Sequence, residues 1–366
     1  MKKSLLKQLI SPVKKERFKI IAFKLETQTY TDGPSEEEIV DGILMTESKE
    51  WYPIIGGIPR ILIGESKYTV MAYYPEFLKK YKQRIEKYVT FEKVGEDIFS
   101  KQNKKTISKF GFQWHHFEDM DSGLNYEDWM SNAVEHKTYF KDKLSLEIGS
   151  GAGGHTLKTL DYGAEVIATD LSHAIDITHK KTKHYKKAHS LQCDLYAIPF
   201  KEKSFDFVYC LGVLQHLPNP KEGFIEMSKF VKENGAYFTN LYSNTRKSQL
   251  LIEDTLRFFI TPFPNPIILF FAHIFNTLDH ILQIWPYKIF KKIDPLSFLF
   301  LNRTKIYSEL GFRKSLDDWF DRLSAPIIKR YSKEDMESWY KETNYKDILV
   351  YDFNNSNWVG YGVANQ

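Results

Sequence analysis

The second half of the chain alternates short apolar runs with amphipathic stretches, and this alternation limits the possible fold more than any other feature. From Leu144 onward the apolar runs are LSLEI, EVIAT, HSLQC, FDFVYC and AYFTNL. Continuous apolar runs are typical of strands that are buried on both faces, and the stretches between them suit helices that connect parallel neighbours. The pattern therefore predicts an α/β fold with a doubly wound sheet.

The rest of the 366 residues divides around this core. Glycines punctuate β-branched runs near the start, as hairpins do, whereas a Phe-rich, helix-like stretch follows the fifth apolar run. The helix-like pattern near Lys333–Thr343 and the runs DILVYDF and NWVGYGV then complete a seven-stranded sheet. We expect a small β-rich unit at 1–66, a helical and aromatic connector at 67–125, the core at 126–247, a helical insertion at 248–310 and the C-terminal completion of the core at 311–366.

Charge and cysteine content exclude several classes of protein. The net charge of +4 is too mild for a dedicated nucleic-acid binder, and the basic run HKKTKHYKK at 179–187 is best interpreted as a solvated helix face. The two cysteines, Cys193 and Cys210, form neither a disulfide framework nor a four-cysteine zinc site. They fall in predicted strands, which favours buried thiols in a cytoplasmic protein.

No targeting segment or membrane span is expected. The first residues lack the long apolar region of a signal peptide. The most apolar segment, 258–278, has prolines at 262, 264 and 266, which should leave an unbroken run too short to cross a bilayer.

A glycine-rich loop follows the first predicted strand of the core. In LEIGSGAGGHT, Gly149, Gly151 and Gly153 allow a sharp turn and a close approach to a ligand at the start of the next helix. Gly149, Gly151 and Gly154 also satisfy the spacing of a nicotinamide-dinucleotide loop, so this loop alone does not choose a cofactor.

Acidic residues at three strand ends narrow the choice. Glu147 ends the first strand, where a carboxylate suits a cationic amino-acid group better than a pyrophosphate. Asp170 ends the second strand and can accept hydrogen bonds from both hydroxyls of a ribose. Asp194 follows the third strand, where it can accept a hydrogen bond from an adenine amine. The fourth strand then runs into an apolar loop that ends at His216.

Together these motifs, between Leu144 and Tyr242, resemble the small-molecule branch of the class I S-adenosylmethionine-dependent methyltransferases. The resemblance implies a Rossmann-like methyltransferase sheet, S-adenosyl-L-methionine as cofactor, and methyl transfer to a small-molecule, glycan or lipid-linked acceptor. In that family the first motif holds the methionine moiety, the Asp after strand two the ribose, and the Asp after strand three the adenine. The implied cofactor contacts are Glu147, Gly149, Gly151, Gly153, Asp170, Leu171, Asp194, Leu195 and Leu211.

The N-terminal residues 17–63 resemble a Trm112-type domain through the pattern GIL…YPIIGGIPRIL. That domain often binds zinc with two cysteine pairs. Met45 and Ser48 stand where the second pair would be, and no cysteine precedes Cys193, so we expect no metal.

Several residues have two interpretations. His216 acts either as a general base near the transferred methyl group or as a residue that orders its loop. Trp114, His115 and Tyr242 are candidates for the acceptor pocket, although Trp114 and Phe117 equally suit packing on the sheet edge. The insertion is either a lid over an acceptor pocket or a surface that contacts a membrane, since KIFKK at 288–292 adds positive charge.

Two other functions remain open from the sequence. A nicotinamide-dependent oxidoreductase or sugar epimerase would use the same glycine loop, but Glu147, Asp194 and the VLQHLP loop disfavour it. A catalytically silent cofactor-binding scaffold would show the same motifs. The acceptor, its reacting atom and the oligomeric state are not encoded in any motif.

Overall fold

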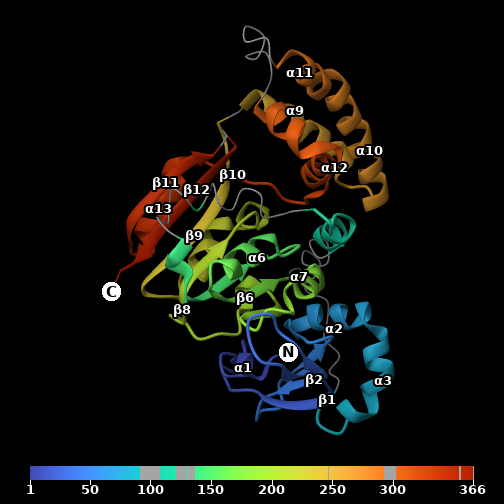
Figure 1. The fold of residues 1–366 in the computed structure, drawn as a ribbon, viewed down its shortest axis with the longest axis vertical. Coiled ribbons are helices and arrows are strands. Elements are labelled where there is room, and N and C mark those ends of the chain that lie inside the picture. The colour runs from blue at the N-terminus through green and yellow to red at the C-terminus, as the bar shows by residue number, and fades with distance from the viewer. Residues whose placement is uncertain are drawn as a thin grey trace.

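The computed structural model describes residues 1–90, 108–120, 130, 137–245, 247–291, 302–353 and 356–365. Parts of the predicted connector, of the start of the predicted core and of the predicted insertion lie outside these residues. The core forms the middle of the molecule, with an N-terminal unit at one end and a helical unit at the other (Figure 1).

The core sheet is α/β and doubly wound, as the alternating pattern predicted. Its strands are β5 (Leu144–Ile148), β6 (Glu165–Asp170), β7 (Ala188–Cys193), β8 (Phe205–Cys210), β9 (Val231–Ser243), β11 (Tyr345–Phe353) and β12 (Asn357–Ala364). Their order in the sheet is β7-β6-β5-β8-β9-β12-β11. The first five are parallel, and β12 is antiparallel to both of its neighbours. This is the predicted methyltransferase-type sheet of seven strands.

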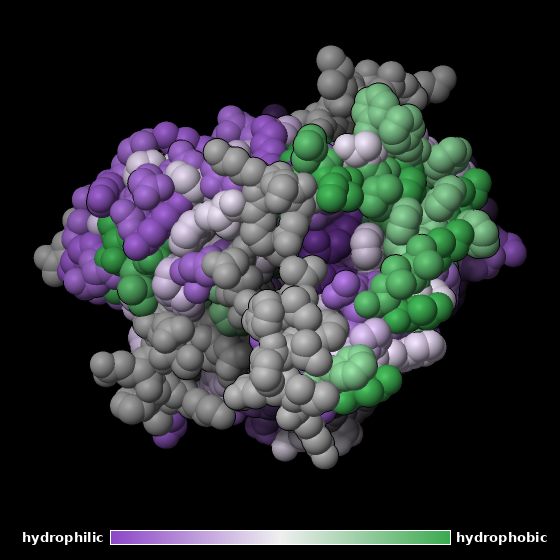
Figure 2. Space-filling model, turned by 90° about the horizontal axis from the view of Figure 1, so that it is seen from above, coloured by the Kyte–Doolittle hydropathy of each residue, from purple (hydrophilic) through white to green (hydrophobic). Residues whose placement is uncertain are grey.

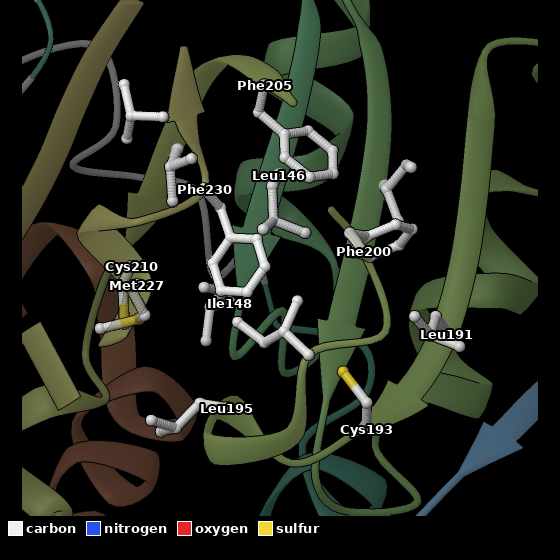
Figure 3. Packing of buried hydrophobic residues seen from close by; sticks show 14 of the residues in the cluster. Leu146, Ile148, Leu191, Cys193, Leu195, Phe200, Phe205, Cys210, Met227 and Phe230 are labelled. Atoms are coloured by element: carbon white, nitrogen blue, oxygen red, sulfur yellow. The ribbon is translucent and has the colours of Figure 1, made fainter. Parts of the chain in front are cut away.

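Helices cover both faces of this sheet and bury its apolar runs (Figure 1). They are α6 (Gly154–Asp161), α7 (Ile175–Thr182), α8 (Pro220–Ser228) and α13 (Lys333–Glu342), with short 3-10 turns at Lys137–Phe140, Leu195–Ala197 and Leu214–His216. On one face Leu146, Ile148 and Phe205 pack with Met227 and Phe230 (Figure 3). Cys193 and Cys210 are buried there, and burial raises the pKa of both thiols, so they are packing residues.

The N-terminal unit continues the core sheet. It contains α1 (Lys3–Leu6), β1 (Lys19–Gln28), β2 (Glu36–Met45), β3 (Trp51–Ile55), β4 (Ile58–Ile61), α2 (Gly64–Tyr73) and α3 (Pro75–Ile85). Strands β1 to β4 are an antiparallel series, and β4 pairs in parallel with the core edge strand β7. Arg60 on β4 is 1% exposed and forms an ion pair with Asp176 on α7 at 2.6 Å. The unit and the core therefore share one sheet of twelve strands.

The helical unit follows β9 and does not join the sheet. It comprises α9 (Lys247–Ile260), α10 (Asn265–Asp279), a π-helical turn (His280–Ile284), α11 (Trp285–Phe290) and α12 (Asn302–Ser324), which is kinked at Gly311. The unit extends beyond the expected boundary at 310. The chain then returns to the core through β10 (Arg330–Tyr331), which pairs with β9.

Phe117 packs within the helical unit and not on the sheet edge suggested by the sequence. It is fully buried, and its ring lies 6.2 Å from that of Phe320 on α12. The segment 108–120 is thus anchored to the helical unit, where Gln113 also donates a hydrogen bond to Asp317 at 2.9 Å.

The expectation that the apolar segment is too short to cross a bilayer is wrong. The prolines at 262, 264 and 266 precede or begin α10, which continues through the π-helical turn into α11. The resulting 26-residue stretch, Asn265–Phe290, is long and apolar enough to span a membrane, judged by length and composition only, and no second such helix occurs among the described residues.

Candidate functional site

The glycine loop between β5 and α6 has the backbone that only glycine adopts easily. Gly149, Gly151 and Gly153 have φ values of 80°, 52° and 79°. A Cβ atom on Gly149 would lie 2.1 Å from Val213, and one on Gly151 would lie 2.7 Å from the Trp114 indole. The loop is therefore held between the strand-four loop on one side and Trp114 on the other.

Asp170 at the end of β6 fastens this loop to the neighbouring strand. Its Oδ2 accepts a hydrogen bond from the Gly151 backbone N–H at 2.9 Å, and its Oδ1 accepts from the N–H and the hydroxyl of Ser172, both at 2.8 Å. Burial raises the pKa of Asp170, while these donors lower it. The carboxylate thus positions the loop as well as offering lone pairs to a ligand.

One carboxylate oxygen of the buried Glu147 side chain has no hydrogen-bond partner among the described residues. The side chain accepts a hydrogen bond from the Thr156 hydroxyl through Oε2, whereas Oε1 has no such partner within the described part of the chain. The Nδ1 atom of His155 lies 4.0 Å from Oε1. Burial raises the pKa of Glu147 to about 7. A cationic donor at Oε1 would satisfy this oxygen and favour its charged form.

Asp194 and Leu195 follow β7, which is separated from β5 by β6 in the sheet. Asp194 is buried and accepts a hydrogen bond from the Tyr196 N–H at 3.0 Å, which caps the turn that begins at Leu195. Leu171 follows Asp170, and its carbonyl accepts a hydrogen bond from Gln192 at 2.9 Å. The structure therefore brings all three predicted acidic residues to the carboxyl ends of adjacent strands, where open α/β sheets bind ligands.

His216 is buried at the end of the strand-four loop, which begins at Leu211. Its Nδ1 pairs with the Ile327 carbonyl at 2.8 Å, so Nδ1 carries the proton and donates it. The Phe110 and Tyr242 rings flank the imidazole at centroid distances of 5.1 and 5.6 Å. Burial lowers the pKa of His216 to about 4. The ring is neutral near pH 7, and the basic atom is Nε2.

A second polar group lies beside His216 and was not identified from the sequence. Gln215 is fully buried, and neither atom of its amide has a hydrogen-bond partner among the described residues. Close by, the Tyr242 hydroxyl donates to Asp321 of α12 at 3.4 Å. Burial, together with Asp317 and Asp318, raises the pKa of Asp321 to about 7. The three aspartates in DDWFD were the available sequence signal, but nothing in the sequence placed them against β9.

Trp114, His115 and Tyr242 do not meet at one place. Trp114 lies against Gly151 of the glycine loop, whereas Tyr242 lies beside His216 of the strand-four loop. His115 is exposed, and its ring stacks on His173 at 5.0 Å. The arrangement suits Trp114 as a cover for the glycine loop and Tyr242 as part of an acceptor site.

Comparison with known families agrees with this geometry. Residues 146–239 match a family model described as a methyltransferase domain. These residues include the glycine loop, Asp170, Asp194 and His216. The described residues contain no group of three or more His, Cys, Asp or Glu side chains able to hold a metal ion.

Curated relatives are similar over the same part of the chain. A ubiquinone biosynthesis O-methyltransferase of Photobacterium profundum is 27% identical over 136 residues, which cover 35% of this chain and 53% of the relative. One of Coxiella burnetii is 24% identical over 119 residues, covering 32% and 51%. A tRNA U34 carboxymethyltransferase of Cellvibrio japonicus is 26% identical over 151 residues, covering 39% and 47%. The chain thus spans about half the length of the curated relatives it matches.

Solved structures with distant similarity include a complex of the Haloferax volcanii Trm112 methyltransferase activator with a putative methyltransferase. It is 11% identical, with a TM-score of 0.40, and covers 74% of this chain and all of that one. A SAM-dependent methyltransferase from Aquifex aeolicus is 12% identical, with a TM-score of 0.39 and coverage of 68% and 97%. The sheet order, the acidic strand ends and the family match agree: residues 146–239 of this chain are a methyltransferase domain of the S-adenosylmethionine-dependent class.

Proposed function

We propose that the protein transfers a methyl group from S-adenosyl-L-methionine to an acceptor with an apolar portion, such as a lipid-linked small molecule or glycan. The observation that carries the proposal is the buried Glu147 carboxylate beside the glycine loop, whose Oε1 lacks a hydrogen-bond partner within the described residues. A carboxylate in this position repels a pyrophosphate and attracts an ammonium group.

The residues present fit this cofactor. The amino group of its methionine moiety would donate a hydrogen bond to Glu147 Oε1. The glycines of the loop, which have positive φ values, leave the backbone beside it accessible. Asp170 and Leu171 would hold the ribose, Asp194 and Leu195 the adenine, and Trp114 would cover the loop. When bound, the cofactor supplies a methyl group on a positively charged sulfur, which is a good leaving group. The protein's own part is then to position the acceptor and to exclude water.

The acceptor site that we propose lies between the strand-four loop and the helical unit. Its polar end is formed by His216, Gln215 and the Tyr242–Asp321 pair. His216 lies in the same loop as Leu211, and its Nε2 can accept a proton from a hydroxyl or amine acceptor. The Gln215 amide, which has no hydrogen-bond partner among the described residues, offers both a donor and an acceptor to a polar head group. The apolar part of the acceptor would extend toward the helical unit, whose interior is rich in Phe.

We also propose that the N-terminal unit acts as a built-in counterpart of a Trm112-type domain. The support is its position: β4 extends the sheet next to β7, the strand that ends at the proposed adenine contact. Arg60 bonds Gln192 at 3.0 Å, and Gln192 in turn bonds the Leu171 carbonyl. The unit would stabilise the adenine end of the site without zinc, and elemental analysis of the purified protein should therefore find no stoichiometric zinc.

We further propose that the protein acts on the cytoplasmic side of the membrane and does not recognise nucleic acid. The support is the two buried thiols, which suit a reducing compartment, and the mild net charge.

Calorimetry with three ligands tests the proposed function. S-adenosylmethionine and S-adenosylhomocysteine should both bind, and NAD should not. Tight binding of NAD together with no binding of either sulfur nucleoside would replace methyl transfer with the oxidoreductase alternative. Binding of both sulfur nucleosides without turnover of any lipid-linked or glycan acceptor would favour a silent scaffold.

A further inference from the structure

Among the described residues, most of the exposed large apolar side chains lie in the helical unit. On α9 the exposed large apolar side chains include Phe258 and Phe259, which are 76% and 66% exposed. The exposed set on α10, the π-helical turn and α11 consists of Ile267, Phe270, Ile274, Leu278, Ile281, Leu282, Trp285, Ile289 and Phe290. Figure 2 views the molecule from the helical-unit end and shows apolar side chains gathered in a broad band. An exposed apolar patch of this kind indicates a surface that contacts a membrane or another protein.

The continuous stretch Asn265–Phe290 buries some of its most polar side chains and exposes large apolar ones, unlike a surface helix of a soluble protein. Asn276, Asp279 and His280 face inward, whereas His273 and Thr277 are exposed. Asp279 forms an ion pair with Arg303 of α12, and Asn276 donates to the Phe312 carbonyl at 3.0 Å. His280 is buried and bonds the Asn276 carbonyl. Only 28% of its most apolar window is buried, so it is not the core helix of a soluble unit. An amphipathic surface helix would place these side chains the other way round.

A spanning orientation conflicts with the packing of the same stretch. To cross a bilayer the helix would have to leave α12, which would unpair Asp279 from Arg303 and bring Asn276, Asp279 and His280 into hydrocarbon. Polar and charged groups near the middle of a bilayer are costly. The stretch therefore suits a position on a membrane, with its inner face still packed on α12.

The charged residues at the C-terminal end of the exposed apolar stretch favour a lipid surface as its partner. Lys288 and Lys291 are the exposed charged residues between Asn265 and Lys291, and both are basic. Trp285 is 54% exposed one turn before Lys288. Aromatic rings beside lysines are typical of the membrane–water interface, where lysine meets anionic head groups. If a second copy of this chain covered the same apolar face instead, the lysines of the two copies would be brought close together.

We propose that the helical unit lies on the surface of an anionic lipid bilayer, with the exposed face of Asn265–Phe290 and of Phe258 and Phe259 immersed below the head groups. The axis of the stretch would be parallel to the membrane plane. This inference does not depend on methyl transfer. If the proposed function is also correct, the acceptor would enter the site from the bilayer.

Vesicle flotation of the full chain tests this placement. The probes are phosphatidylcholine vesicles with and without phosphatidylglycerol, and the test variant is Phe270→Glu with Leu282→Glu, two side chains that are 60% and 65% exposed. The control variant, Val13→Glu with Leu25→Glu, changes two side chains that are 57% and 43% exposed on the N-terminal unit. The wild type and the control should float with anionic vesicles. The test variant should bind at least about tenfold more weakly, because each charge replaces a large immersed apolar side chain.

Further measurements separate the alternatives. Melting temperature and S-adenosylhomocysteine affinity should be unchanged in both variants, since all four side chains are exposed. Alkaline carbonate should release the wild type from vesicles, whereas resistance to carbonate would mean a spanning helix and would overturn the proposal. Failure of the wild type to float, equal flotation of the test variant, or a stable dimer that the test variant dissociates would also overturn it.

Discussion

The N-terminal unit and the helical unit lie at opposite ends of the core and are attached to it in different ways (Figure 1). The N-terminal unit shares the sheet through β4 and β7, and its buried Arg60 reaches α7. The helical unit shares no strand with the sheet and leaves a broad apolar face exposed. This difference motivates our proposal that the first unit stabilises the cofactor side of the core, whereas the second supplies the acceptor side and the surface that contacts the membrane.

The largest expected effect concerns His216. This residue is the proposed general base, and its hydrogen bond to the Ile327 carbonyl links the strand-four loop to the segment after α12. If Nε2 is the general base, His216→Ala should lower kcat by about 100- to 10,000-fold. Steady-state kinetics with a methyl acceptor would measure this. The wild-type rate should not show a step at the usual histidine pH, because burial lowers the pKa of His216 to about 4.

The variant His216→Asn separates the two interpretations of this residue. An asparagine amide can still donate to the Ile327 carbonyl, which His216 Nδ1 contacts at 2.8 Å, but it cannot act as a base. If His216 is the general base, the kcat of His216→Asn should be as low as that of His216→Ala. Recovery of the rate in the Asn variant would make His216 a residue that only shapes the loop.

The second prediction compares the two units directly. Arg60→Ala should lower the free energy of unfolding by about 3 kcal/mol, because it leaves the mostly buried Asp176 carboxylate without its cation. It should also weaken S-adenosylhomocysteine binding, since Arg60 orients Gln192 and Gln192 holds Leu171. Chemical denaturation and calorimetry measure the two effects.

The matched variant in the helical unit is Arg303→Ala, which removes a cation from Asp279 and Asp318. It should loosen α10 and α12 in hydrogen exchange but leave cofactor affinity within about twofold of wild type, a difference of less than 0.5 kcal/mol. Equal losses of cofactor affinity in the two variants would contradict the contrast between the units.

The core was predictable from the sequence because its signals are local. Each buried parallel strand is a continuous apolar run, and the residues that end β5, β6 and β7 meet at one edge whatever the details of packing. The glycine loop and the acidic strand ends could therefore be placed by residue number.

The features that could not be predicted depend on contacts between distant segments. The pairing of β4 with β7 joins residues separated by more than a hundred positions. Nothing in the sequence around Arg60 indicates that its side chain pairs with Asp176. Asp321 meets Tyr242 only because α12 folds back onto the core. The length of the apolar helix was misjudged because prolines at a helix start were interpreted as breaks within it.

The third prediction tests the cofactor side of the core. Asp170→Ala should weaken binding of S-adenosylhomocysteine by about 1.5–3 kcal/mol, because it removes an acceptor for ribose hydroxyls and releases the Gly151 N–H. Calorimetry measures the loss. Ser172→Ala is the control: it removes one hydroxyl donor to Asp170 and should cost about 1 kcal/mol or less. Unchanged affinity in Asp170→Ala would mean that the ribose site lies elsewhere.

The last prediction is a dependence of cofactor affinity on pH that arises from Glu147. Burial raises the pKa of Glu147 from 4.5 to about 7. Between these values the folded chain without cofactor holds a proton that the unfolded chain has lost. Its stability should therefore fall as pH rises from about 4.5 to about 7 and remain level above that range.

Cofactor affinity should change in the opposite direction, because an ammonium group at Oε1 needs the charged carboxylate. Affinity should rise with pH up to about 7, by no more than about tenfold per pH unit, since a single proton is released. Glu147→Gln should bind more weakly and lose this slope. Asp321→Asn is the matched control: burial also raises the pKa of Asp321 to about 7, so it too should contribute to the fall in stability. Because Asp321 lies on the acceptor side, its variant should keep the slope of cofactor affinity. If Asp321→Asn loses the slope and Glu147→Gln keeps it, the cofactor's amino group is not held by Glu147, and the division between a cofactor side and an acceptor side fails.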